Sequence, residues 1–144
     1  MAILVFNLEK EAWSVMALPD ETKSKCRYWN VELREIQGLL SFSCHIPEKC
    51  IEIWMLRDYA NKVWSKDFVI DVTLLGGRRN SGASIYFVFP LEVMTDGRIL
   101  LQVHNGNGCR WFYFDPRDGR IQLAHIKGFL TTIYAENLVP VLGF

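Results

Sequence analysis

The residues best suited to chemistry gather in one short stretch, where Cys44 and His45 are followed by Cys50. Thiolate and imidazole groups bind Zn²⁺, so the three could supply three ligands of a tetrahedral site. A fourth ligand at standard spacing is missing, and no two of the four cysteines, which include Cys26 and Cys109, form a C-x-x-C pair. We therefore predict no metal site and expect reduced cysteines that serve as small core residues.

Nucleophilic catalysis would need a nucleophile, a base and an orienting group within hydrogen-bond reach. Cys44 and His45 are adjacent, so on a strand their side chains point to opposite faces and cannot pair directly. Ser43 or Cys50 could meet His45 or His104 in space, which the sequence alone leaves open.

Two other patterns resemble sites only in part. Glu52 and Asp58 could form a carboxylate pair, but their positions favour a strand residue and a turn former. The glycine- and arginine-rich residues 76–82 lack the spacing and the Gly-Lys-Ser/Thr ending of a phosphate-binding loop, and no helix pattern follows them. We predict no catalytic residue and no cofactor, and thus a protein that is not an enzyme.

These residues belong to strands, and the clearest strands lie within residues 51–70. Two apolar, aromatic-rich runs flank the polar turn 57–62, which is the pattern of a β-hairpin. One sequence pattern recurs three times, a polar turn residue (the anchor) followed six residues later by a large apolar residue. The pairs are Asn7 and Trp13, Asp58 and Trp64, and Asp115 and Ile121. The anchors are 51 and then 57 residues apart. A unit that repeats at roughly 40–50 residues is typical of propeller blades, with kelch repeats at the long end.

The strand pattern predicts an all-β fold in a single domain over residues 1–144. We expect strands at residues 2–8, 12–18, 31–36, 39–44, 50–56, 63–70, 85–89 or 91–94, 99–103, 109–114, 120–126 and 131–139. They group into a half blade (1–18), two four-stranded blades (31–70 and 85–126) and a terminal strand (131–142). The prediction is a partial kelch-like β-propeller of about two and a half to three antiparallel blades.

Two details support stacked blades. Several strands are apolar at successive positions, as expected for sheets that are covered on both faces. Asp96-Gly97 between apolar runs favours a tight hairpin turn in which both residues adopt positive φ, and Gly119 suits a left-handed position. A β-sandwich with a rich core is the rival fold, and no window has the periodicity of a capped helix.

Composition narrows the function classes. The chain has 144 residues, half of them hydrophobic and 13% aromatic, which favours a packed core. Sixteen basic and sixteen acidic residues cancel, so no summed charge attracts nucleic acid or an anionic membrane. With no apolar run of about 18 residues and no leader pattern, we expect a soluble protein of the cytoplasm, the nucleus or both.

Several short motifs follow one another along the chain. They are Phe6-Asn7-Leu8 with Glu11 and Trp13, Gly38-Leu39-Leu40, Ile51-Glu52-Ile53-Trp54-Met55 with Asp58-Tyr59 and Trp64-Ser65-Lys66, Pro90-Leu91, Asp96-Gly97-Arg98-Ile99-Leu100-Leu101, Tyr113-Phe114-Asp115-Pro116, and Tyr134-Ala135-Glu136-Asn137-Leu138-Val139. In these motifs the chain resembles the plant F-box-associated domains, the kelch-like C-terminal halves of F-box proteins. The resemblance covers nearly the whole chain.

The resemblance implies a non-catalytic module that recognises the targets of a cullin-type (SCF) ubiquitin ligase, with a protein target of ubiquitination as partner. Family members grip a Skp-type adaptor through an F-box, and this sequence has no F-box-like segment. We therefore expect a truncated member, an alternative product or a partial gene model, coupled to the adaptor only if an F-box lies upstream. The alternatives are a fragment without independent activity, one that associates with a full-length relative, and a propeller enzyme acting on carbohydrate.

Binding residues are expected in loops, where propellers vary without harm to the core. The first set is Arg78, Arg79 and Asn80, and the second is His104, Asn105 and Asn107. Trp13, Trp54, Trp64 and Trp111 recur with the repeat and are expected to pack between blades, whereas Trp29 lies outside it and could be exposed. Since an open ring leaves strand edges and apolar faces unpaired, we also expect self-association.

Overall fold

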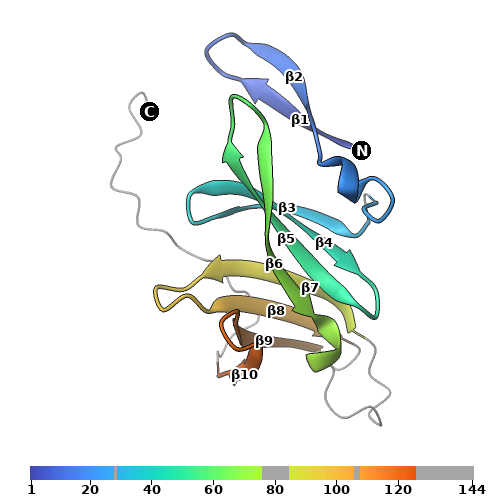
Figure 1. The fold of residues 1–144 in the computed structure, drawn as a ribbon, viewed down its shortest axis with the longest axis vertical. Helices are drawn as coiled ribbons and strands as arrows, with labels where there is room; N and C mark the ends of the chain where they lie inside the picture. Colours follow the sequence, from blue (N-terminus) through green and yellow to red (C-terminus); the bar gives the residue numbers. More distant parts are fainter. Residues whose placement is uncertain (28, 76–84, 106–107, 126–144) are drawn as a thin grey trace.

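The computed structural model describes residues 1–27, 29–75, 85–105 and 108–125, which form ten β-strands (Figure 1). The strands are β1 (Ala2–Asn7), β2 (Ala12–Ala17), β3 (Val31–Ile36), β4 (Leu39–Ile46), β5 (Cys50–Asp58), β6 (Val63–Asp71), β7 (Ile85–Val93), β8 (Ile99–Asn105), β9 (Gly108–Asp115) and β10 (Arg120–Ala124). Two single 3-10 turns, η1 (Asp20–Thr22) and η2 (Val72–Leu74), accompany them. The predicted all-β class is confirmed for this part of the chain.

The strands form three antiparallel sheets, and none of them closes on itself. The hairpin sheet is β1–β2, the first sheet has the order β3-β4-β5-β6, and the second sheet has the order β10-β9-β8-β7. Every hydrogen-bonded neighbour is also the neighbour in sequence, so each sheet is a simple meander. In Figure 1 the hairpin sheet, the first sheet and the second sheet follow one another along the long axis.

The first sheet is covered on both faces, and β5 shows this best. Ile51, Ile53 and Met55 point toward the second sheet, whereas Trp54 and Leu56 point toward the hairpin sheet, and all five are buried. An apolar run without alternation is therefore accommodated, because a doubly covered sheet has no wet face.

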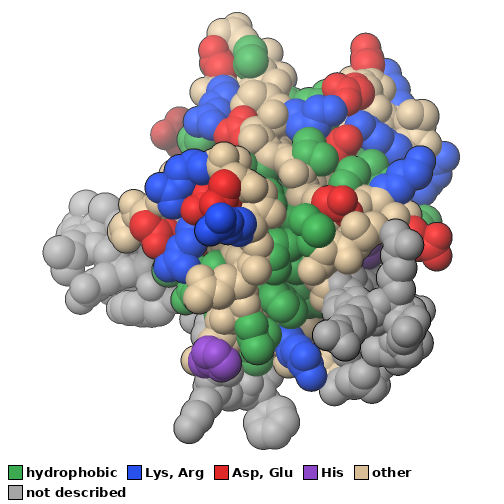
Figure 2. All heavy atoms as spheres, turned by 60° about the horizontal axis from the view of Figure 1, so that its bottom comes forward, with side chains coloured by type: hydrophobic (Ala, Val, Ile, Leu, Met, Phe, Trp, Pro, Cys, Tyr) green, Lys and Arg blue, Asp and Glu red, His purple; other side chains and the backbone are tan. Residues whose placement is uncertain are grey.

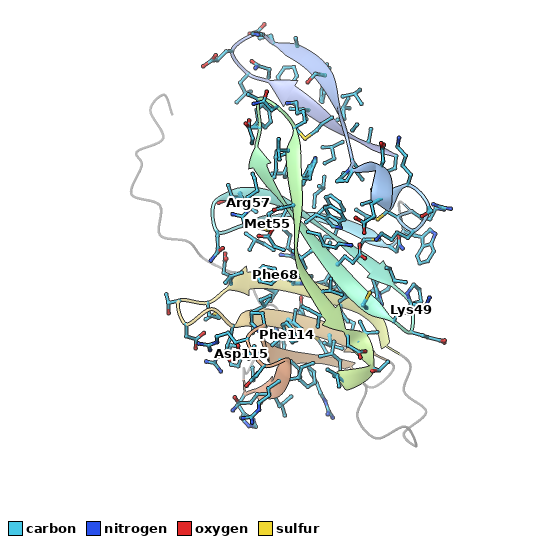
Figure 3. All side chains as sticks on the ribbon, in the orientation of Figure 1. Lys49, Met55, Arg57, Phe68, Phe114 and Asp115 are labelled. Carbon is cyan, nitrogen blue, oxygen red and sulfur yellow. The ribbon has the colours of Figure 1, made fainter. Side chains whose placement is uncertain are left out.

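The two interfaces have different composition. Between the two four-stranded sheets the packing is mostly aliphatic, and Met55, Phe68 and Phe114 (Figure 3) come together from β5, β6 and β9. Toward the hairpin sheet it is aromatic: the Phe42 ring stacks on Trp54 with centroids 5.8 Å apart and meets Trp64 edge-on at 5.0 Å. Such aromatic pairs add about 0.5–1.5 kcal/mol beyond the area that they bury.

The two first strands, β3 and β7, also touch each other, so the four-stranded sheets meet along corresponding strands. A groove lies along this line of contact.

Turn geometry agrees with the sequence in one case and corrects it in another. Gly119 has φ of +72°, as expected for a left-handed turn position. In the turn between β7 and β8, Gly97 has φ of +87° but Asp96 is not left-handed, so the prediction that both residues adopt positive φ is wrong. The Met94 carbonyl accepts from the Gly97 N–H at 2.9 Å, and the Met94 N–H donates to Arg98 at 2.7 Å, which makes a three-residue loop rather than a two-residue turn.

Other differences from the sequence prediction concern strand ends. β7 runs from Ile85 to Val93, so it joins the alternative segments 85–89 and 91–94 into one strand that ends one residue before Met94. Pro90 is accommodated at a register shift opposite β8. β4, β5 and β8 each extend two residues beyond the predicted ends. The predicted strand at residues 131–139 lies outside the described residues.

Two of the recurring residues are turn formers, as their spacing suggested. Asp58 accepts the Asn61 N–H at 3.0 Å, and Asp115 accepts the Arg117 N–H at 3.0 Å. Hydrogen bonds from the Arg117 side chain and backbone lower the pKa of Asp115 to about 2.

The tryptophans divide into buried and exposed ones. Trp54 and Trp64 are largely covered in the core between the first sheet and the hairpin sheet. Trp111 is also buried, but within the described residues it packs in a cluster of its own sheet with Leu91 and not between two sheets. Trp13 departs from the predicted packing between blades, since its side chain is 65% exposed. It lies on the outer face of the hairpin sheet, which no other described sheet covers.

Surface charge is mixed. On the face in Figure 2, basic and acidic side chains alternate and do not gather by sign. Within the described residues no helix has the length and hydropathy needed to cross a membrane.

Candidate binding groove between the two four-stranded sheets

A groove of about 220 Å³ lies where the first and second sheets meet. It is lined from three segments of the chain: Trp29, Asn30, Val31 and Glu32; Ser43 and His45; Phe87, Val88 and Phe89. Sites for cofactors and drug-sized ligands measure about 300–1,000 Å³. The groove is therefore of a size to receive a single side chain rather than a whole cofactor.

Aromatic side chains form much of the wall of the groove, and two of these side chains are open to solvent. Trp29 is 55% exposed and Phe87 is 49% exposed, although both are large apolar side chains. The Phe87 and Phe89 rings stack at a centroid distance of 6.0 Å, and Phe89 meets the His104 ring edge-on at 5.4 Å. One wall is thus a preassembled stack, which can receive a ligand with little loss of side-chain entropy.

Polar groups line the other side. Glu32 lies directly opposite Ser43 in the β3–β4 register, so the two side chains share one face of the sheet. The Glu32 Oε1 atom pairs with Arg34 at 2.8 Å, but its Oε2 atom is buried and has no hydrogen-bond partner in the described part of the chain. An unsatisfied buried acceptor costs about 1–3 kcal/mol, so a donor that reached Glu32 Oε2 would recover this cost.

His45 adds a neutral group to the groove. Burial lowers the pKa of His45 below its ordinary value of 6.5. At neutral pH the ring is therefore uncharged and can both donate and accept a hydrogen bond.

Asn30 holds the groove residues in place. Its Oδ1 atom accepts the Arg27 N–H at 2.6 Å, while its Nδ2 atom donates to the carbonyls of His45 at 2.9 Å and Lys25 at 3.1 Å. The backbone of Asn30 also accepts the His45 N–H at 2.8 Å. The turn that carries Trp29 is thereby fixed to the end of β4.

The residues considered for metal binding are separated by the strand. Cys44 is buried in the core toward the hairpin sheet, whereas His45 lines the groove on the other face. The described residues contain no group of three or more potential metal ligands.

Two of the thiols, Cys44 and Cys50, are poorly suited to nucleophilic attack. A hydrogen bond with the Cys26 thiol, together with burial, raises the pKa of Cys44 far above its ordinary value. Burial likewise raises the pKa of Cys50. All four cysteines are free, and a thiol with a raised pKa holds less of the reactive thiolate. The same contact with Cys44 lowers the pKa of Cys26, but Cys26 is buried.

One thiol–imidazole contact does occur, and the sequence did not suggest it. His104 and Cys109 face each other on β8 and β9, with Sγ and Nε2 3.7 Å apart. Among the described residues no carboxylate hydrogen-bonds to the His104 ring, so the third member of a catalytic arrangement is missing there.

The possible carboxylate pair is also separated. Glu52 is buried and receives hydrogen bonds from Lys25 Nζ at 2.7 Å and from Trp54 Nε1 at 3.2 Å. Asp58 instead caps its own turn through Asn61. Glu52 therefore anchors the connector between the hairpin sheet and the first sheet.

The loop residues proposed for partner binding are only partly described. Arg78, Arg79, Asn80 and Asn107 lie outside the described residues, as does the side chain of Asn105. His104 is described and packs behind the Phe89 wall of the groove.

Sequence reasoning missed Glu32, Phe87 and Phe89 as groove residues, because each reads as an ordinary strand position. The signal that was available was Trp29, the one tryptophan outside the repeat.

Comparison of the chain with models of protein families, with curated proteins and with solved structures finds no match in any of the three.

Proposed function

We propose that the chain is a non-catalytic protein-binding module whose recognition surface is the groove between its two four-stranded sheets. The observation that carries the proposal is the pair of exposed aromatic side chains, Trp29 and Phe87, on either side of a cavity of about 220 Å³. Tryptophan and other aromatic residues dominate binding hot spots, because they bury much area with few rotatable bonds.

The lining also indicates what the groove receives. Apolar and aromatic walls favour a ligand with an apolar body. Glu32 Oε2, which has no partner among the described residues, favours a hydrogen-bond donor at the tip of that ligand. A partner side chain such as tyrosine, lysine or arginine has both features. The groove thus suits an anchor residue in an exposed segment of another protein.

The broader assignment rests on architecture and motif order. Three stacked antiparallel sheets, with corresponding strands β3 and β7 in contact, are compatible with neighbouring blades of a propeller. The order of motifs resembles the F-box-associated domains. These two features support the proposal that the module recruits targets for ubiquitination, with a Skp-type adaptor engaged only when an F-box accompanies the chain.

The proposal is tested by selecting ligands from a displayed library of random peptides with the purified 144-residue chain. Selected peptides are then titrated against the wild type and against Trp29→Ser and Phe87→Ser. Each substitution is expected to weaken binding by about tenfold or more, the loss typical of a hot-spot residue.

Val69→Ser is the matched control. Val69 is 54% exposed and lies on β6, at the edge of the first sheet farthest from β3. Its substitution should leave the affinity unchanged, and thermal unfolding should show that all three variants are folded. A library that yields no ligand, or ligands that bind Trp29→Ser as well as wild type, would refute the proposed function.

A further inference from the structure

The hairpin sheet has one covered face and one open face. Its inner face contributes Ile3 and Met16, which are 9% and 1% exposed in the core shared with the first sheet. The outer face carries cross-strand pairs that are mostly in solvent. They are Leu4 with Val15, at 63% and 70% exposure, and Phe6 with Trp13, at 41% and 65%.

The outer face is apolar throughout the strands. Ala2 and Ala17 form the remaining cross-strand pair, and no charged or amide side chain lies on this face of β1 or β2. The Phe6 and Trp13 rings are already in contact, with centroids 4.8 Å apart, so the surface is ordered before any partner arrives.

The area is large for an isolated patch. A fully buried aromatic side chain covers about 150–250 Å², and the exposed fractions of the four main side chains amount to about 400–500 Å². The largest apolar patch on a typical monomer is about 300–600 Å² and is commonly a contact site. A two-stranded sheet that leaves this much apolar surface in water is also only marginally stable by itself.

We propose that the outer face of the hairpin sheet binds the same face of a second copy of this chain. An uncharged apolar face is complementary to itself under two-fold symmetry, since no like charges are brought together. The same lack of charge gives it no feature for selecting a partner by electrostatic complementarity. Two such faces can pack at the spacing of about 10 Å found in β-sandwiches.

The area sets the expected strength. Two faces bury about 800–1,000 Å² together, which is below the roughly 1,200–2,000 Å² of stable specific interfaces. The dimer is therefore weak and reversible, and its population rises with protein concentration. This surface is separate from the groove, so the inference stands or falls independently of the proposed function.

Sedimentation equilibrium of the full chain, from about 1 µM to about 1 mM, tests the proposal. Wild type should pass from monomer to dimer, and the double variant Leu4→Thr/Val15→Thr should weaken the dimer by about tenfold or more. Threonine is β-branched and favoured in strands, so it suits both positions and the hairpin is preserved. Val69→Thr is the control, with a similarly exposed valine on β6, and should dimerise as wild type does.

A second measurement locates the contact. A photoreactive benzoylphenylalanine at position 15 should crosslink to residues of the outer face in a second copy. Three results would overturn the proposal: a monomer at every concentration, a dimer that is insensitive to the double variant, or a crosslink from position 15 to a segment of its own chain.

Discussion

Replacing Asn30 with alanine tests how the groove is held in place. Asn30 is 8% exposed, and its side chain makes three hydrogen bonds, one accepted from Arg27 and two donated to the carbonyls of Lys25 and His45. Alanine removes all three at once. It also leaves two carbonyl oxygens and one N–H in a partly buried region without their partner.

The expected loss follows from these contacts. Each net hydrogen bond contributes about 0.5–1.5 kcal/mol, so three of them imply a destabilisation of about 2–4 kcal/mol. Single domains are stable by only about 5–15 kcal/mol. With a urea slope of about 2 kcal/mol per molar, the unfolding midpoint should fall by about 1–2 M.

Asn61→Ala is the matched control in the same assay. Asn61 lies in an exposed turn, where its side chain donates to Asp58 at 2.7 Å, and its loss should cost less than about 0.5 kcal/mol. If Asn30→Ala lowers the midpoint no more than Asn61→Ala does, the described anchoring of the Trp29 turn is wrong.

Three further predictions concern pH, the buried carboxylate and the thiols. The folded-state pKa of His45 lies below 6.5, so on acidification the unfolded chain takes up this proton before the folded chain does. The free energy of unfolding should therefore fall as the pH drops below about 6.5. His45→Gln should remove this part of the decrease when urea midpoints are measured over a series of pH values. Glu52→Ala should lower the free energy of unfolding by about 2 kcal/mol in the same assay. This is less than for a fully buried ion pair, because the partner Lys25 is partly exposed. An unchanged urea midpoint would contradict the anchoring role of Glu52. Under native conditions a thiol reagent should modify the half-exposed Cys50 and Cys109 first, and the two buried cysteines only on unfolding; four equal rates would contradict the burial pattern.

Strand positions were predictable because the sequence states them locally. Apolar runs such as residues 50–56 and turn formers such as Asp58 and Gly119 act within a few residues, so their signals need no knowledge of the tertiary fold. The ends of the strands were less well predicted. Whether β7 continues through Pro90 depends on register against β8, which is a long-range property.

The candidate groove could be predicted only in part. Trp29 stood out because it breaks the repeat, but Glu32 and Phe87 come from different sheets and meet only when β3 and β7 are brought together. The exposure of Trp13 was missed for a related reason. The repeat predicts that Trp13 packs against a neighbouring blade. It does not reveal whether such a blade is present beside the hairpin sheet.

Fluorine NMR of the chain labelled with 5-fluorotryptophan tests the central claim, that the groove is the recognition surface, most directly. The five tryptophans give five resonances, and Trp29→Phe assigns the one in the groove. On addition of a selected peptide, the Trp29 resonance should shift in proportion to binding while the Trp13 resonance stays in place. Binding that leaves the Trp29 resonance unmoved would contradict the account.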